Sequence, residues 1–434
     1  MLEDKQSYLS DLNEAQKKAV LKINGPSMVI AGAGSGKTRV LTYKIVHLIK
    51  NGIDPFEILA LTFTNKAARE MKSRISSMIG DGESKNIWMG TFHSVFAKIL
   101  RFEAHKIGFT SDFTIYDVQD SERLISSIIK EMNLDKDSYR PKTIRNRISS
   151  LKNSFISVNA YFSNSDLTES DKLSRRPKTG DIYKEYSDRL IKSNSMDFDD
   201  LLLKTNGLLN NFPEVLAKYQ EKFKYILVDE YQDTNNSQYL IIKSLADKYQ
   251  NICVVGDDAQ SIYSFRGAHI SNIINFRNDY DDVEVYRLEQ NYRSTKYIVN
   301  AANSVIDNNK NKIHKEVWTD NEFGNKIQIT ANPSDIAEAR LISQKILNLI
   351  KSENNYKDFV ILYRTNAQSR VIEDSLRNSS IPYKIYGGVS FYNRKEIKDI
   401  LAYLRLVVNN NDEESLKKYI HKELMYAIKA INNS

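Results

Sequence analysis

The stretch Met28-Val29-Ile30-Ala31-Gly32-Ala33-Gly34-Ser35-Gly36-Lys37-Thr38 decides the fold of this chain. A short apolar run, a glycine-rich bend and the start of a helix follow one another, which is the context of a phosphate-binding loop. The glycines lack a Cβ, so the backbone can aim its N–H groups at an anion, and the helix adds the positive end of its dipole. The pattern predicts that Lys37 contacts the β- and γ-phosphates and that the Thr38 hydroxyl binds Mg²⁺, although the usual leading glycine is Ala31.

Composition narrows the class of protein. The 434 residues allow two to four domains at about 100–200 residues each. The net charge of +7 is a weak sign of an acidic partner such as nucleic acid. Cys253 is the only cysteine, which excludes a disulfide framework and a Cys-based zinc site, and its apolar neighbours predict buried packing. The N-terminus lacks the apolar core of a signal peptide, and the sequence has no run of 18 apolar residues. We therefore expect a cytoplasmic protein with no membrane span.

Several later apolar runs end in polar residues, as buried strands do when they deliver side chains to one edge of a sheet. The runs are Ile58–Phe63, Ile87–Ser94 with its turn, Tyr225–Val228 and Ile252–Val255. Because ligands collect at the carboxyl ends of parallel strands, we expect Phe63, Asn65 and His93 to face a ligand. Packing alone also explains Phe63 as a core residue and His93 as a hydrogen-bonded structural residue.

Carboxylates follow the strand at Tyr225–Val228, and they are the expected partners of a phosphate loop. Asp229 is predicted to hold Mg²⁺ through water, because this small ion keeps much of its hydration shell. Glu230 is predicted to orient or deprotonate an attacking water. Gln260, after the next strand, is placed to hydrogen-bond a γ-phosphate and report its loss.

Aromatic and arginine side chains lie beside this predicted nucleotide site. Tyr263 and Phe265 suit sequence-independent binding of a single strand, since stacking is worth about 1–3 kcal/mol per base whatever the base. Arg293 is a candidate arginine finger, and Tyr292 can stack on adenine. Gln16, near the start of a helix capped by Asn13, carries an amide that can pair with a purine edge, although alone it reads as an exposed helix residue.

Two further regions organise the chain. Helical patterns dominate from about Phe109 to Lys192, and residues 136–192 hold 13 Lys and Arg against 7 Asp and Glu, which favours a contact with a phosphate backbone. Residues 295–386 read as a second α/β region with strands at Phe359–Arg364 and Ile381–Tyr386. A helix is expected from Ile397 to Val408.

Together these residues resemble the superfamily 1 DNA helicases of the UvrD/Rep/PcrA type, which move 3′ to 5′ on single-stranded DNA. The resemblance covers residues from about 9 to 408. Its motifs are Ala31–Arg39, Thr62–Ala67, Gly90–Ser94, Asp229–Asp233, Val255–Tyr263 and Asn291–Ser294. The departure at Ala31 is normal for that family.

The resemblance implies a role for each matched residue. It implies an ATP hydrolase and helicase in DNA repair or replication, with ATP and Mg²⁺ as cofactors and single-stranded and duplex-junction DNA as partners. Residues similar to the family's adenine contacts are Gln16, Arg39 and Tyr292. Those similar to its hydrolysis site are Lys37, Thr38, Asp229, Glu230, Gln260 and Arg293, beside the phosphate loop Ala31, Gly32, Ala33, Gly34, Ser35 and Gly36. Those similar to its DNA-facing positions are Phe63, Asn65, His93, Tyr263 and Phe265, the last often Trp in the family.

The implied fold is α/β: a P-loop NTPase with RecA-like parallel-sheet lobes, ATP between them, and a helical insertion domain. Lobe 1A is expected at 1–109 and 193–280, the insertion 1B at 110–192, lobe 2A at 281–386, and the start of a 2B insertion at 387–434. The family's two later motifs, one of which supplies a second γ-phosphate arginine, are not found. The chain is therefore predicted to be the N-terminal portion of a helicase with an incomplete second lobe.

Three alternatives stay open at this point. The chain is either an active motor or a truncated relative that binds ATP and DNA without unwinding. A helicase–nuclease subunit would keep the ATPase, but no nuclease-like carboxylate cluster is evident. A metabolite kinase would also use a phosphate loop, and the predicted DNA-facing positions argue against it.

Overall fold

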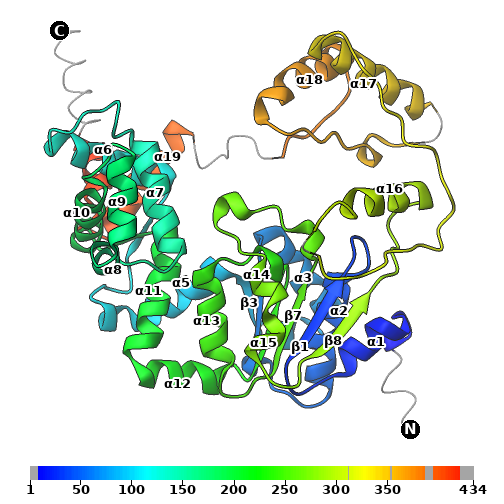
Figure 1. Ribbon diagram of the computed structural model, residues 1–434, viewed down its shortest axis with the longest axis horizontal. Coiled ribbons are helices and arrows are strands. Elements are labelled where there is room, and N and C mark those ends of the chain that lie inside the picture. Colours follow the sequence, from blue (N-terminus) through cyan, green and yellow to red (C-terminus); the bar gives the residue numbers. More distant parts are fainter. Residues whose placement is uncertain (1–7, 311, 352–353, 387–393, 421–434) are drawn as a thin grey trace. The chain divides into compact units, whose positions relative to one another are not determined.

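The computed structural model describes residues 8–310, 312–351, 354–386 and 394–420 (Figure 1). The chain forms two compact units. The first comprises Met1–Asn325 and Arg405–Lys417, and the second comprises Lys326–Leu404 and Lys418–Ser434. The predicted start of the 2B insertion at Gly387 and the chain from 421 onward lie outside the described residues.

A six-stranded parallel sheet organises the first unit. Its strand order is β3 (Trp88–Thr91), β2 (Ile58–Thr62), β6 (Tyr225–Val228), β7 (Ile252–Gly256), β1 (Ser27–Ala31) and β8 (Glu284–Leu288). The order is not sequential, as expected of a doubly wound α/β fold in which parallel strands need crossover connections. The predicted α/β class is confirmed.

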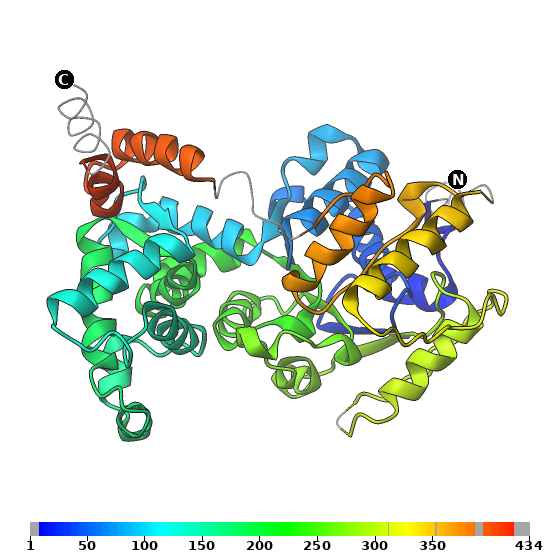
Figure 2. The same ribbon diagram turned by 90° about the horizontal axis from the view of Figure 1, so that it is seen from above.

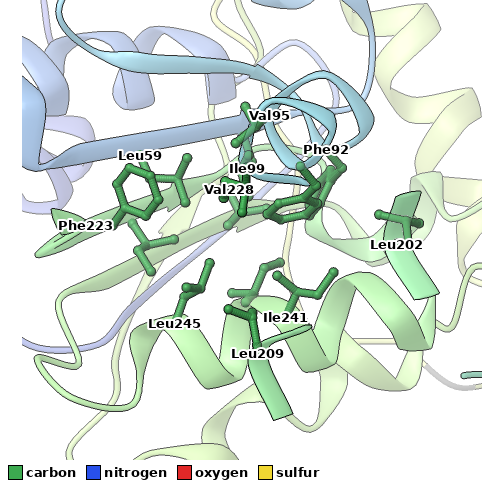
Figure 3. Close-up of a cluster of buried hydrophobic side chains, with 14 of the residues drawn as sticks. Leu59, Phe92, Val95, Ile99, Leu202, Leu209, Phe223, Val228, Ile241 and Leu245 are labelled. Atoms are coloured by element: carbon green, nitrogen blue, oxygen red, sulfur yellow. The ribbon is translucent and has the colours of Figure 1, made fainter. Parts of the chain in front are cut away.

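Helices cover both faces of this sheet, which explains why its central strands are continuous apolar runs. One face packs against α1 (Glu14–Leu21), α2 (Lys37–Lys50) and α3 (Asn65–Ile79). The other packs against α5 (Phe92–Glu103), α11 (Phe198–Asn211), α12 (Pro213–Lys222) and α13 (Asn236–Ala246). Figure 3 shows Leu59 and Val228 of the sheet facing Leu209, Ile241 and Leu245 of these helices. Cys253 is buried in the sheet, as predicted.

Helices fill the region of the predicted insertion, and they gather into one group around a shared hydrophobic core (Figure 2). They are α6 (Val118–Glu131), α7 (Pro141–Asn153), α8 (Val158–Phe162), α9 (Ser165–Leu173) and α10 (Thr179–Lys192). A two-stranded parallel sheet of β4 (Thr114–Tyr116) and β5 (Ser195–Asp197) lies at the base of the insertion. Several of its basic residues pair with nearby carboxylates, including Arg147 with Asp171 and Arg145 with Glu122, so part of the predicted charge excess is neutralised locally.

A segment near the end of the described chain belongs to this first unit. Asn409 is buried, and its side-chain amide donates hydrogen bonds of 3.0 Å to the Thr114 hydroxyl and to the carbonyls of Ser193 and Asn194. Asp412 accepts a hydrogen bond of 2.9 Å from the Tyr116 hydroxyl. Residues 405–417 therefore close over the ends of β4 and β5.

The described chain contains further helices. They are α4 (Asp81–Ser84), α14 (Ser271–Ile274), α15 (Phe276–Asp279), α16 (Lys296–Ile306), α17 (Asp335–Ile350), α18 (Asn366–Asn378) and α19 (Lys395–Val408). Among the described residues, every helix is too short or too polar to cross a bilayer.

The second unit departs from the predicted second α/β region. Its small core joins α17 to α18 through Ile346, Leu376 and Ile381. The strands predicted at Phe359–Arg364 and Ile381–Tyr386 are not strands here, and that prediction is wrong for the described structure. A buried strand needs backbone partners on both sides, and the described residues of this unit form no ladder; Val360 and Leu362 are 78% and 87% exposed.

The boundary predicted at 281 also needs adjustment. Strand β8 pairs in parallel with β1 from Ser27↔Glu284 to Ala31↔Leu288, so the first sheet continues past that point. The periodicity of a strand shows that it exists, and the choice of its partner depends on tertiary packing. The other predicted domain divisions stay predictions.

Candidate active site

The glycine-rich loop connects β1 to α2 in a shape that only glycine fits at two positions. Gly34 and Gly36 have φ of +68° and +89°, in the left-handed region. A Cβ on Gly36 would lie 2.9 Å from Nε2 of Gln16, and one on Gly32 would lie 2.6 Å from a methyl carbon of Val317. The backbone therefore stays free of side chains where an anion would approach the start of α2.

The end of strand β6 meets this loop. The Lys37 ammonium lies 3.1 Å from Oε2 of Glu230. The Thr38 hydroxyl hydrogen-bonds with Asp229, which is only 2% exposed. Four of the predicted hydrolysis residues thus lie together at the carboxyl ends of two strands. Lys37 and Glu230 are in contact although they are 193 positions apart in the sequence.

Burial gives Asp229 an unusual proton affinity. It raises the pKa of this carboxyl to about 7, and the neighbouring charge of Glu230 adds to the rise. Lys37 and the hydrogen bond from Thr38 oppose it without cancelling it. The site therefore holds excess negative charge that a bound cation would relieve.

Glu230 is held in a strained conformation. Its φ of +50° and ψ of +44° place it in the left-handed region, which costs a non-glycine residue on the order of 1–3 kcal/mol. Its Oε2 accepts hydrogen bonds from Lys37 and, at 2.9 Å, from the Gln232 side-chain amide. The surrounding contacts thus fix the carboxylate that we expected to handle the attacking water.

Gln260 connects to the same network through Asp257. Its side-chain amide donates to Oδ2 of Asp257 over 2.6 Å. The backbone N–H of Asp257 donates to Oε1 of Gln232 over 2.9 Å. Gln260 is therefore linked to Glu230 through Asp257 and Gln232, and its role toward a γ-phosphate stays a prediction.

Residues after β8 dock directly on the phosphate loop. The Asn291 amide donates to the Ala33 carbonyl over 2.6 Å, and the Tyr292 N–H donates to the Gly34 carbonyl over 3.0 Å. Oδ1 of Asn291 accepts the N–H of Arg293 over 2.8 Å. The backbone of Tyr292 and Arg293 thus lies beside the loop, and the roles that the resemblance implies for these two residues stay predictions. Asn291 itself was not predicted, although it stands inside a motif that was recognised.

The predicted adenine contacts surround the start of α2. Gln16 is buried, and its amide donates to the Ser35 carbonyl over 3.0 Å. Asn13 caps α1 and also donates to the Tyr292 hydroxyl over 2.7 Å. Arg39 follows Thr38 on α2, with its guanidinium 3.6 Å from Asp11. The reading of Gln16 as an exposed helix residue is wrong, because its amide supports the loop.

The predicted DNA-facing residues fall into two groups. The rings of Phe63 and Tyr263 stack at 5.4 Å and 29°, and Tyr263 lies 6.0 Å from Phe265, which is 72% exposed. We call Phe63, Tyr263 and Phe265 the aromatic row. His93 lies apart, edge-on to Phe198 at 5.9 Å, and burial lowers its pKa.

Asn65 is exposed at the first position of α3. Phe198 was not singled out from the sequence, where it reads as a helix-start residue; it is half exposed beside His93.

The donor set at Thr38 and Asp229 fits a magnesium ion. The residues that the structure describes contain no group of three or more His, Cys, Asp or Glu side chains suited to a metal. A hydroxyl and a carboxylate are hard oxygen donors, and Mg²⁺ is commonly held by one or two such groups while water and substrate phosphates complete its shell.

Comparison with known proteins agrees with this geometry. The model of the UvrD/REP helicase N-terminal domain matches residues 12–281, more than half of the chain. The chain belongs to the UvrD/REP helicase family. The model of the UvrD-like helicase C-terminal domain matches residues 286–431. The prediction that the family's C-terminal motifs are absent is therefore wrong, because residues 286–431 match the C-terminal domain model.

Named relatives of this helicase-family chain come from bacteria. A protein of Bacillus subtilis (strain 168) named ATP-dependent DNA helicase PcrA is 47% identical over 421 residues, covering 95% of this chain and 55% of that protein. Proteins of the same name from Staphylococcus aureus (strain Mu50) and Staphylococcus epidermidis are each 45% identical over 416 residues, covering 96% of this chain and 56% of those proteins. The chain thus spans little more than half the length of these relatives.

Proposed function

We propose that this chain is the motor of an ATP-dependent DNA helicase, which hydrolyses ATP and moves 3′ to 5′ along single-stranded DNA in repair or replication. The observation that carries the proposal is the meeting of Lys37, Thr38, Asp229 and Glu230 at the ends of β1 and β6. The aromatic row follows β2 and β7 of the same sheet. The residues for ATP hydrolysis and those for binding single-stranded DNA would then be carried by the same β-sheet.

Each residue of the nucleotide site has a proposed task. Lys37 and the N–H groups of residues 32–37 would bind the phosphates, and Thr38 with Asp229 would hold Mg²⁺, which supplies charge neutralisation on the phosphate oxygens. Glu230 would orient the attacking water and accept its proton, and Arg293 would stabilise charge developing on the γ-phosphate. Tyr292, Gln16 and Arg39 would hold the adenine.

The aromatic row supports a task on single-stranded DNA. Stacking on aromatic rings is indifferent to base identity, which suits a motor that must accept any sequence. Movement requires two conformations that differ in their grip on the strand, since a nucleotide can shift such an equilibrium only through differential affinity. We propose that His93 and Asn65 contribute further contacts and that duplex junctions are the substrate for unwinding.

We keep the expected domain roles as part of this proposal. Residues 110–192 would be the 1B insertion between the two parts of lobe 1A, which extends through β8. Lobe 2A would follow, with the 2B insertion from about 387. The site of action would be the cytoplasm.

An ATPase assay on the 434-residue chain tests the proposal. We expect turnover that single-stranded DNA stimulates, and that small phosphate acceptors do not. Lys37→Ala should abolish it, whereas Lys72→Ala, a matched change at an exposed position of α3, should leave it intact. Normal turnover in Lys37→Ala would overturn the assignment of the site, and stimulation by a small acceptor instead of DNA would favour a kinase.

A further inference from the structure

Lys315 is a buried lysine whose chemistry the proposed mechanism does not use. Its side chain is 7% exposed, and its ammonium lies 2.8 Å from Oδ1 of Asp257 and also pairs with Asp258. Burial lowers the pKa of Lys315, but the charges of the two carboxylates outweigh that effect and raise it overall. The lysine is therefore a fixed cation facing the loop that carries Gln260.

The two oxygens of Asp257 serve different partners. Oδ1 accepts from Lys315 and, at 3.1 Å, from the N–H of Ala259. Oδ2 accepts from the Gln260 side-chain amide over 2.6 Å. In this arrangement one of the two N–H groups of the Gln260 amide is engaged by Asp257, so the tightness of that bond limits how freely the amide can turn toward a γ-phosphate. The strength of the hydrogen bond from Gln260 to Asp257 depends on how much of the negative charge of Asp257 is compensated by Lys315.

The segment that carries Lys315 also contacts the nucleotide loop. We call Ile313–Trp318 the linking segment. The N–H of Ile313 donates to Oδ2 of Asp258 over 2.9 Å. Val317 lies over Gly32, and the Trp318 carbonyl accepts the N–H of Asn291 over 2.7 Å. One short stretch of chain therefore joins the Gln260 loop to the phosphate loop and to the residues beside Arg293.

We propose that Lys315 is a positioning residue for hydrolysis, which compensates the Asp257 carboxylate so that the Gln260 amide can be released to the γ-phosphate. This inference rests on the proposed ATPase. Without the ammonium, Asp257 would keep its full charge for its remaining donors and hold Gln260 more tightly. Nucleotide binding would continue, because neither Lys37 nor Thr38 contacts Lys315, while turnover would slow.

A double-mutant cycle tests the proposal on the full 434-residue chain. Lys315→Met should lower the DNA-stimulated kcat about tenfold or more with less than about a threefold change in KM for ATP. Lys315→Arg, which preserves the charge, should restore most of the rate. In a Gln260→Ala background, Lys315→Met should have little further effect, because the amide that Asp257 would hold is absent.

Controls separate this role from simple stabilisation. Lys312, three residues before Lys315, forms an exposed pair with Asp307. Lys312→Met breaks that pair and should leave kcat unchanged. If Lys315→Met does not fold, Lys315→Gln keeps a hydrogen-bond donor without the charge and takes its place in the cycle. Losses of kcat that multiply in the double variant, or no rescue by arginine, would overturn the role of Lys315 while wild-type turnover upholds the proposed function. A wild-type chain without turnover would overturn both.

Discussion

Replacing Asp229 with asparagine should stabilise the ligand-free protein, and the gain should depend on pH. Burial and the charge of Glu230 raise the pKa of Asp229 to about 7 in the folded chain, against an ordinary value of 3.8. A raised carboxyl pKa gives stability that is complete below the unfolded value and is lost as pH rises through the folded value. At about 1.4 kcal/mol per pH unit, wild type loses up to about 4 kcal/mol between pH 4 and pH 7, whereas Asp229→Asn does not.

Urea denaturation of both proteins at pH 5, 6, 7 and 8, without nucleotide or magnesium, measures this difference. The free energy of unfolding of Asp229→Asn relative to wild type should rise by about 1.4 kcal/mol per pH unit and level off above pH 7. Asp281→Asn, in an exposed turn, is the matched control and should show no such rise. The stabilised variant should lack ATP turnover, because the proposed magnesium ligand is gone.

A constant difference between pH 5 and pH 8 would refute this reasoning. It would mean that Asp229 ionises in the folded chain much as it does in the unfolded chain, so the site does not store charge repulsion. Stabilisation by Asp281→Asn of equal size would refute it as well, because the gain would then reflect the net charge of the protein instead of the buried site.

Three further outcomes follow from the contacts. Phe265→Ala should weaken single-stranded DNA binding by about 1–3 kcal/mol in a fluorescence titration with no change in melting temperature, since the ring is largely exposed. Asn291→Ala should raise KM for ATP and destabilise the chain by roughly 1 kcal/mol, because the Ala33 carbonyl loses its donor. Asn409→Ala should cost about 2–3 kcal/mol in urea denaturation by leaving buried acceptors unpaired, whereas exposed Asn410→Ala should cost almost nothing; equal effects would contradict the closure of residues 405–417 over β4 and β5.

Sequence reasoning worked best where local pattern and tertiary role coincide. Strands such as Tyr225–Val228 are buried on both faces, so they are uninterrupted apolar runs. The polar residues that follow each strand must then lie at the edge of the sheet where ligands bind. For that reason Lys37, Asp229 and Glu230 could be expected close together, and the structure brings them together, while their roles stay predictions. The same reasoning failed at Phe359–Arg364, where an apolar run has strand propensity but no described neighbour to pair with.

Contacts between distant polar residues could not be predicted in this way. Asn291 and Ala33 are 258 positions apart, and Lys315 and Asp258 are 57 apart. Each pair depends on the whole fold to bring a donor to an acceptor, and neither member has a local pattern that names the other. Lys315 in sequence is one of several lysines in a polar stretch, and only its burial against two carboxylates distinguishes it.

The proposed hydrolysis site combines features that each oppose folding. Glu230 adopts a left-handed backbone conformation, Asp229 is a buried carboxyl beside another carboxylate, and the Gly34 and Gly36 turns carry the entropic cost of glycine. The packed sheet beneath them supplies the stability that holds this arrangement in place before any ligand arrives. A bound cation would relieve the charge at Asp229, whereas the left-handed backbone conformation of Glu230 does not depend on that charge. The electrostatic cost at Asp229 is therefore the part that cation binding can remove, and the backbone conformation of Glu230 is a separate cost that the fold carries.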